Sequence, residues 1–74
     1  MSIFPNPVSE KLNITSVNAF DKVEIYNTLG RLVLSEISNS NILSIDMSSL
    51  NSGVYFVKVY SDAKEVGVMM TQKL

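Results

Sequence analysis

The sequence contains no cysteine and no histidine. Without them the chain cannot form a disulfide, a thiolate metal site, a Cys–His or Ser–His–Asp nucleophile system, or an ordinary zinc, copper or haem site. The absence of cysteine does not show whether the protein works in an oxidising or a reducing compartment, because secreted proteins need not carry disulfides. We therefore expect no enzyme activity and no metal or cofactor, and a fold that is held together by its hydrophobic core alone.

Tryptophan is also absent, and charge is sparse: six basic and seven acidic residues give a net charge of −1. No basic stripe is present to neutralise phosphates, which argues against a nucleic-acid partner. The longest uninterrupted apolar run, residues 54–57, is far too short to span a bilayer. The first residues lack the basic-then-apolar pattern of a signal peptide.

A chain of 74 residues forms one domain, near the lower end of what folds alone. Its hydrophobic content of 46% is ordinary for a globular domain and too high for intrinsic disorder. We expect a single domain over residues 1–74 with a modest core.

Apolar residues in the first half of the chain recur every second position, as in half-buried strands. Leu12 and Ile14 share one face of a strand over residues 11–15. Val23 and Ile25 do so over residues 22–27. Gly30 then supplies a hairpin turn.

The return strand, residues 31–37, is expected to bury Leu32 and Leu34. Val33 and Ile37 lie on the opposite face and are also apolar, so the pattern does not decide which face is buried. Residues 38–41 form a polar loop, and residues 42–46 a further short strand. In the segment that follows, Leu50 is expected to plug into the core, and residues 51–53 form a turn that ends at Gly53.

The most strand-like segment, residues 54–60, is rich in β-branched and aromatic residues, as a central strand is. A turn at residues 62–63 leads into a last strand on which Val66, Val68 and Met70 are predicted to share the inner face. No segment shows helical periodicity. The pattern predicts an all-β fold, a small antiparallel β-sandwich of six to seven short strands.

Few residues are candidates for chemistry. Most carboxylates lie at turns or outward strand positions and are interpreted as solvated surface charge. Asp46 is expected to make an Asx-type hydrogen bond to N–H groups of the following loop. Tyr55 falls on the core face. Tyr26 and Tyr60 are more exposed and could form a sugar-binding platform, but amphipathic residues at the edge of the core are the favoured interpretation.

Taken in order, the motifs resemble a known family, the C-terminal type A sorting domain of the type IX (Por) secretion system. The resemblance starts with Pro5, Asn6 and Pro7 after an aromatic residue. It continues through a hairpin that contains Gly30 and a block that contains Asp46, Leu50, Gly53 and Tyr55. These motifs cover essentially the whole chain, and Lys73 and Leu74 match part of the family's basic-apolar tail.

The resemblance implies an Ig-like sandwich that acts as a non-catalytic sorting signal at the C-terminus of a cargo protein. The implied partners are the type IX translocon, a sortase-like peptidase and a covalently linked N-terminal cargo, with no small-molecule substrate. The cargo would cross the periplasm and reach the cell surface or medium. Residues 1–7 would then be a stiff, extended boundary to the cargo, because Pro5 and Pro7 lack N–H donors.

A folded sandwich with an accessible terminal strand can be bound by edge pairing. The strand over residues 64–74 is the hypothetical recognition element, with Lys64, Val66, Val68, Met70, Lys73 and Leu74 as its recognition residues. An adhesion or spacer module of immunoglobulin or fibronectin type and, after it, a carbohydrate-binding module are the alternatives.

Overall fold

The computed structural model describes residues 1–74 and contains five β-strands. They are β1 (Ser2–Phe4), β2 (Lys11–Asn27), β3 (Leu32–Asp46), β4 (Gly53–Ser61) and β5 (Lys64–Lys73). All pairs of these strands are antiparallel, which confirms the predicted all-β antiparallel class. No helix suited to crossing a membrane is present.

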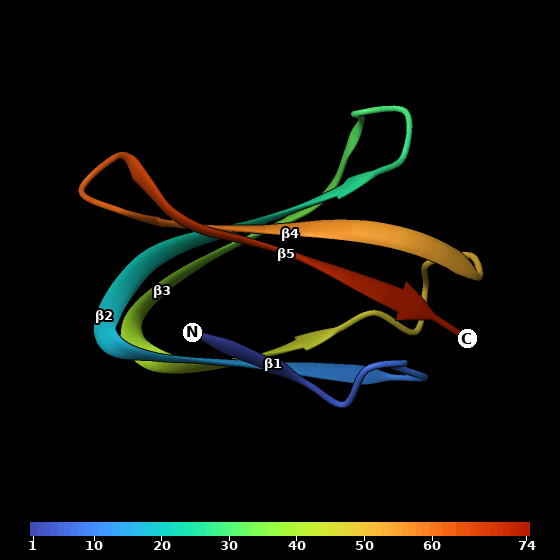
Figure 1. Ribbon diagram of the computed structural model, residues 1–74, viewed down its shortest axis with the longest axis horizontal. Coiled ribbons are helices and arrows are strands. Elements are labelled where there is room, and N and C mark those ends of the chain that lie inside the picture. Colours follow the sequence, from blue (N-terminus) through green and yellow to red (C-terminus); the bar gives the residue numbers. More distant parts are fainter.

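The sheet curls because its two longest strands, β2 and β3, bend together. Their pairing shifts register on both sides of Phe20, after Thr15 and before Lys22. Such irregularities bend a strand and increase its twist. The hairpin therefore turns back on itself, and its two halves lie in facing layers (Figure 1).

The two layers contain different strands. In the first layer, residues 11–15 of β2 lie between β1 and residues 42–46 of β3. In the second layer, the order is residues 32–37 of β3, residues 22–27 of β2, β4 and β5. β4 is thus flanked on both sides, as predicted for residues 54–60, and β5 lies at the edge of the sheet.

The hydrophobic core lies between the layers. Leu12, Ile14, Val23 and Ile25 are fully buried, which confirms the alternation predicted for β2. The full cluster is Ile3, Val8, Leu12, Ile14, Phe20, Val23, Ile25, Ile45, Met47, Tyr55, Val57 and Val59. Half-buried residues pack against this cluster, including Leu50, as expected for a plug.

The prediction for the return strand was right for one leucine and wrong for the other. Leu34 packs against the core, whereas Leu32 is exposed. The pairing shifts register between Ile25 and Tyr26, so Leu32 lies opposite Tyr26 rather than opposite a core residue. Val33, whose facing was left open, packs against the core, and Ile37 is exposed.

The strand count is five rather than six to seven. Residues 38–41, predicted to be a polar loop, lie inside β3, and residues 16–21 join two predicted strands into β2. Polar side chains suit this bend because several of its positions face solvent, and strand pairing across it is reduced to the single pair Phe20–Ser40. The immunoglobulin-like assignment stays a prediction.

Two hairpin turns follow the predicted chemistry. Gly30 adopts φ 81°, where a residue without Cβ is favoured. Asp62 and Ala63 form the turn between β4 and β5 with φ of 53° and 63°. Positive φ at both central residues is the requirement of the type I′ turn that matches strand twist. The Asp62 N–H donates a 2.8 Å hydrogen bond to Asp21 Oδ2, which ties this turn to β2.

The first seven residues differ in detail from a simple extended segment. Residues 2–4 form β1, paired with residues 13–15, and Ile3 is buried. The chain then bends through Pro5, Asn6 and Pro7, with both X–Pro peptide bonds cis. The Asn13 side chain donates a 3.2 Å hydrogen bond to the carbonyl of Phe4 where this bend begins.

Candidate functional site

The candidate site is the free edge of β5, the last strand of the second layer. One side of β5 pairs with β4 from Lys64 to Lys73, and no strand pairs with the other side. A single parallel bridge, between Val8 and Lys73, closes that other side at its far end. An edge strand with free backbone groups can accept another strand. The element predicted for recognition is therefore the accessible one.

The facing predicted for β5 was wrong. Val68 and Met70 were placed inside, yet they are 47% and 60% exposed. Directly paired residues share a face of the sheet, and β4 sets that face: buried Val57 lies opposite Met69. The inner positions of β5 are therefore the odd-numbered ones. The even-numbered apolar residues point to solvent.

Val66, also predicted to face inward, is 57% exposed for a related reason. The β4–β5 pairing jumps from Val59–Gly67 to Tyr60–Glu65, so Val66 is the extra residue of an irregularity and has no direct partner. A bulge in an edge strand interrupts its regular pairing surface. The regular part of the edge therefore begins after Val66.

The exposed apolar residues of β5 continue onto β4. Phe56 pairs with Met70 and is half-buried, and Val54, next on the same face, is exposed. We call Val54, Phe56, Val68 and Met70 the outer patch. Apolar side chains gathered beside a free strand edge are typical of a surface that binds a partner.

The remaining recognition candidates lie at the two ends of β5. Lys64 is exposed at the β4–β5 turn, and Leu74 is exposed just after β5. Lys73 differs, because only 8% of it is exposed and its Nζ donates a 2.9 Å hydrogen bond to the carbonyl of Leu74. The structure thus brings Val68 and Met70 into one patch and leaves Lys64 and Lys73 outside it.

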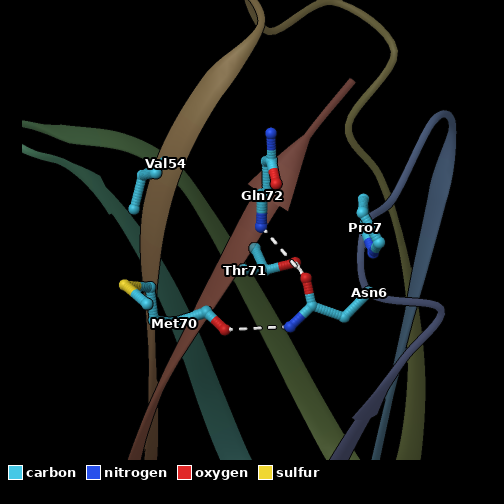
Figure 2. A pocket seen from close by; sticks show the side chains of 6 residues that line it. All are labelled: Asn6, Pro7, Val54, Met70, Thr71 and Gln72. Atoms are coloured by element: carbon cyan, nitrogen blue, oxygen red, sulfur yellow. Dashed lines mark hydrogen bonds between the residues drawn. The ribbon is translucent and has the colours of Figure 1, made fainter.

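The Pro-Asn-Pro motif contacts the end of β5, about 65 residues away along the chain. The Asn6 side chain donates a 3.2 Å hydrogen bond to the carbonyl of Met70. Its Oδ1 accepts 3.1 Å hydrogen bonds from the Thr71 hydroxyl and the Gln72 N–H (Figure 2). Asn6, Pro7, Val54, Met70, Thr71 and Gln72 line a hollow of about 320 Å³ here.

The other motif residues lie elsewhere and shape the fold. The Asp46 carboxylate accepts a 2.9 Å hydrogen bond from the Ser48 N–H, which confirms the predicted Asx-type bond. Hydrogen bonds from Ser48, with a smaller contribution from Lys11, lower the pKa of Asp46. Tyr55 is buried, as predicted, and its hydroxyl donates to the carbonyl of Asn51. Gly30 lies at a turn and Leu50 packs against the core, whereas Gly53, predicted to end a turn, is the first residue of β4.

A charged aromatic cluster covers the outer face beside the outer patch. The Tyr26 hydroxyl donates a 2.8 Å hydrogen bond to Glu24, which lowers the pKa of Glu24 and raises that of Tyr26. Hydrogen bonding to Glu24 also raises the pKa of Tyr60 to about 12. Lys22 Nζ lies 4.7 Å from the ring centroid of Tyr60, and Lys58 Nζ lies 4.8 Å from that of Tyr26.

These cation–π contacts bear on the sugar-binding alternative. A sugar platform needs an open aromatic face, but an ammonium group lies over each of these two rings. The arrangement favours the interpretation of Tyr26 and Tyr60 as amphipathic residues at the edge of the core.

The outer patch and the residues that Asn6 contacts were not predicted from the sequence. Alternation along residues 54–60 places Val54 and Phe56 on the face opposite Tyr55, so this part of the patch had a signal in the sequence. The contacts of Asn6 with Thr71 and Gln72 had none, because they join opposite ends of the chain.

Known proteins match nearly the whole chain. The family described as "Secretion system C-terminal sorting domain" matches residues 2–73. The chain is also 32% identical over 68 residues to "Ulvan lyase NLR42" of Nonlabens ulvanivorans. That match covers 89% of this chain and 13% of the lyase. The similarity is thus to a small segment of a much larger protein.

Proposed function

Because the chain belongs to the family of type IX secretion C-terminal sorting domains, we propose that it directs an attached cargo protein across the outer membrane through recognition of β5 by the translocon. Domains of this family serve as secretion signals and are in general not catalysts. The family implies a secreted protein, exported to the cell surface or the medium.

The observation that supports this proposal is the free edge of β5 next to the outer patch. Backbone N–H and C=O groups along a free edge supply affinity for an added strand, and alternate side chains supply specificity. Val68 and Met70 are exposed on the face beside this edge. The translocon would read their apolar side chains together with the backbone.

Further parts of the proposal rest on the family. The cargo would be covalently linked at the N-terminal side, with residues 1–7 at the boundary, and would pass through the periplasm. A sortase-like peptidase would remove the domain. The similarity to a lyase over a small part of its length is consistent with a module attached to a larger enzyme. We also propose, from the family, that the curled sheet is a variant of the Ig-like sandwich.

A fusion of residues 1–74 to the C-terminus of a periplasmic reporter, expressed in a type IX-competent strain, tests the proposal. We expect the reporter outside the cell, and we expect export to be lost in a translocon mutant and after deletion of residues 64–74. Efficient export of the deleted fusion would show that β5 is not the recognition element. Retention of the intact fusion inside the cell would contradict the sorting function itself.

Point variants test whether the translocon reads the outer patch. Val68→Lys and Met70→Lys place a charge in the outer patch without touching the core, and should reduce export. Ile37→Lys is the matched control, because Ile37 is 78% exposed on β3, at the other side of the second layer. Exposed substitutions of this kind change stability by only about 0.5 kcal/mol. An equal loss of export in all three variants would argue against specific reading of the patch.

A further inference from the structure

We propose that residues 5–8 form a clasp that holds the last residues of β5 by their free edge and withholds them from strand pairing until it opens. Four hydrogen bonds between main-chain groups and the clasp carry this inference. Asn6 bonds the Met70 carbonyl and the Gln72 N–H. Val8 donates 2.8 Å to the Gln72 carbonyl and accepts 2.8 Å from the Leu74 N–H.

These bonds occupy consecutive backbone groups along the free edge of β5. In a strand, the N–H and C=O of one residue point to the same side, and the side alternates from residue to residue. The groups that Asn6 and Val8 occupy belong to Met70, Gln72 and Leu74, so even-numbered residues face the free edge. Their successive groups, from the Met70 carbonyl to the Leu74 N–H, all have partners in the clasp.

The Asn6 side chain takes the place of a strand residue. A primary amide presents one acceptor and one donor group with the same chemistry as a peptide unit. Figure 2 shows this amide facing β5, with its nitrogen toward Met70 and its oxygen toward Thr71 and Gln72. Asn6 thus completes the pairing of β5 without adding a further regular strand.

The prolines prevent the clasp from becoming a new edge. Pro5 and Pro7 have no N–H and cannot donate to a strand that approaches from outside. Val8 anchors the clasp, because its side chain is fully buried in the core. The clasp therefore caps the end of β5 and is fixed at one end.

The edge of β5 has two parts as a result. By alternation, the backbone groups of Val68 face the edge, and no partner is present for them. Beyond the Met70 carbonyl the edge is closed. A strand added to β5 would therefore pair beside Val68 and would stop at Met70 while the clasp is closed.

The functional consequence rests on the proposed sorting function. Lys73, paired with Val8 in the parallel bridge, is buried on the inner face, and the closed clasp holds the Leu74 N–H. Reading of the terminal residues by a translocon strand then requires displacement of Asn6 and Val8. The Pro-Asn-Pro motif thereby controls how much of the C-terminal strand a partner can use.

Amide hydrogen exchange in the 74-residue chain tests the clasp itself without any partner. In Asn6→Ala, we expect exchange at the Gln72 amide to rise about tenfold or more, while Met69 and Thr71, which face β4, stay protected. Asn41→Ala is the matched control, because Asn41 is exposed on β3 and makes no side-chain hydrogen bond to β5. Unchanged exchange at Gln72 would overturn the clasp.

A second variant separates the clasp from a general loss of stability. Asn6→Asp keeps the acceptor for the Gln72 N–H and loses the donor to the Met70 carbonyl. We expect Gln72 to remain protected in this variant. An equal rise at every β5 amide in Asn6→Ala, or loss of Gln72 protection in Asn6→Asp, would contradict the assigned role of the side chain.

A cross-link tests whether opening is needed. The chain has no cysteine, so Val8→Cys with Lys73→Cys introduces a single possible disulfide across the parallel bridge. In the reporter fusion, we expect export of the oxidised double variant to fall about tenfold below that of either single variant, a loss equivalent to about 1.4 kcal/mol. Equal export would overturn the opening step. Failure of the unmodified fusion to leave the cell would instead count against the sorting function, and the exchange results would still decide the clasp.

Discussion

The hydroxyl of Tyr55 donates a 2.7 Å hydrogen bond to the main-chain carbonyl of Asn51, four residues earlier in the chain. Tyr55 is buried against the core at the start of β4, and Asn51 lies in the loop that precedes it. The bond therefore fixes the loop between β3 and β4 to the core. A similar corner bond from a tyrosine to the upstream backbone is found in sandwich folds.

Replacement of Tyr55 by Phe should lower the free energy of unfolding by about 1 kcal/mol, because the ring still packs while the Asn51 carbonyl loses its donor. Urea denaturation measures this loss. Tyr26→Phe is the control for removal of a hydroxyl, since the Tyr26 hydroxyl bonds a side chain on the outer face. A Tyr55→Phe domain as stable as the unmodified one would show that the corner bond does not hold the loop.

Gly53, at the start of β4, should resist substitution although there is space around it. A Cβ there would meet no atom within 4 Å, but φ is 154°, a conformation that L side chains rarely adopt. Gly53→Ala should therefore cost about 1–3 kcal/mol of stability. Gly67→Ala is the contrasting case, because there a Cβ would meet only the flexible end of Met1, 2.5 Å away. A larger loss at Gly67 than at Gly53, measured by thermal unfolding, would contradict the backbone argument.

The two adjacent methionines of β5 should respond differently to the same change. Met69 packs against the core, whereas Met70 is 60% exposed on the outer patch. Met69→Lys should lower stability by about 1–2 kcal/mol because a charged group is forced toward the core. Met70→Lys should change it by no more than about 0.5 kcal/mol. Equal losses in urea denaturation would contradict the facing of β5.

The comparison of β2 with β5 shows where sequence patterns suffice. On β2, the alternating apolar residues Leu12, Ile14, Val23 and Ile25 are the buried ones, so period two gave the correct facing. On β5, the same pattern gave the opposite of the true facing. Its inner residues include Thr71, 1% exposed, and Lys73, whose polar groups are satisfied by hydrogen bonds.

Features that depend on residues nearby in the chain could be predicted from the sequence, and a contact between distant segments could not. The Gly30 turn, the Asp46 bond and the burial of Tyr55 depend on residues nearby in the chain, and all three were predictable. The contact of Asn6 with β5 depends on closure of the whole sheet. The motif could be recognised in the sequence, but its partner could not.

Glu24 should control the titration of two tyrosines. Hydrogen bonding to Glu24 raises the pKa of Tyr60 to about 12 and also raises that of Tyr26. In Glu24→Gln both values should return toward about 10, the ordinary value for tyrosine. Glu65→Gln is the control, because Glu65 makes the smallest contribution to both shifts. Ring resonances followed by NMR from pH 9 upward report each tyrosine, and a raised Tyr60 pKa in Glu24→Gln would contradict the assignment.

The sign of the stability change follows from these raised values. The folded domain favours the neutral phenol of Tyr60, so this contribution is fully present below the unfolded pKa of about 10. It is lost as the pH rises toward the folded pKa of about 12. Alkaline destabilisation should therefore be weaker in Glu24→Gln than in the unmodified domain when both are measured by urea denaturation.

Asp46 should make the opposite contribution at low pH. Hydrogen bonds from the Ser48 side chain and N–H lower its folded pKa, with help from Lys11. The resulting stability is present above the unfolded pKa of about 3.9 and is lost as the pH falls from there through the lowered folded value. Asn at this position can still accept the Ser48 N–H but does not titrate. Asp46→Asn should therefore keep the loop and lose part of the acid sensitivity.

Urea denaturation at pH 6 and at successively lower pH measures this difference. Some acid sensitivity should remain in Asp46→Asn, because the pKa of Glu24 is also lowered, chiefly by the hydrogen bond from Tyr26. Addition of Glu24→Gln should reduce the acid sensitivity further, and the two reductions should add, since the two carboxylates are on opposite layers and share no partner. If Asp46→Asn lost as much stability on acidification as the unmodified domain, the bond to Ser48 would not be the source of the lowered pKa.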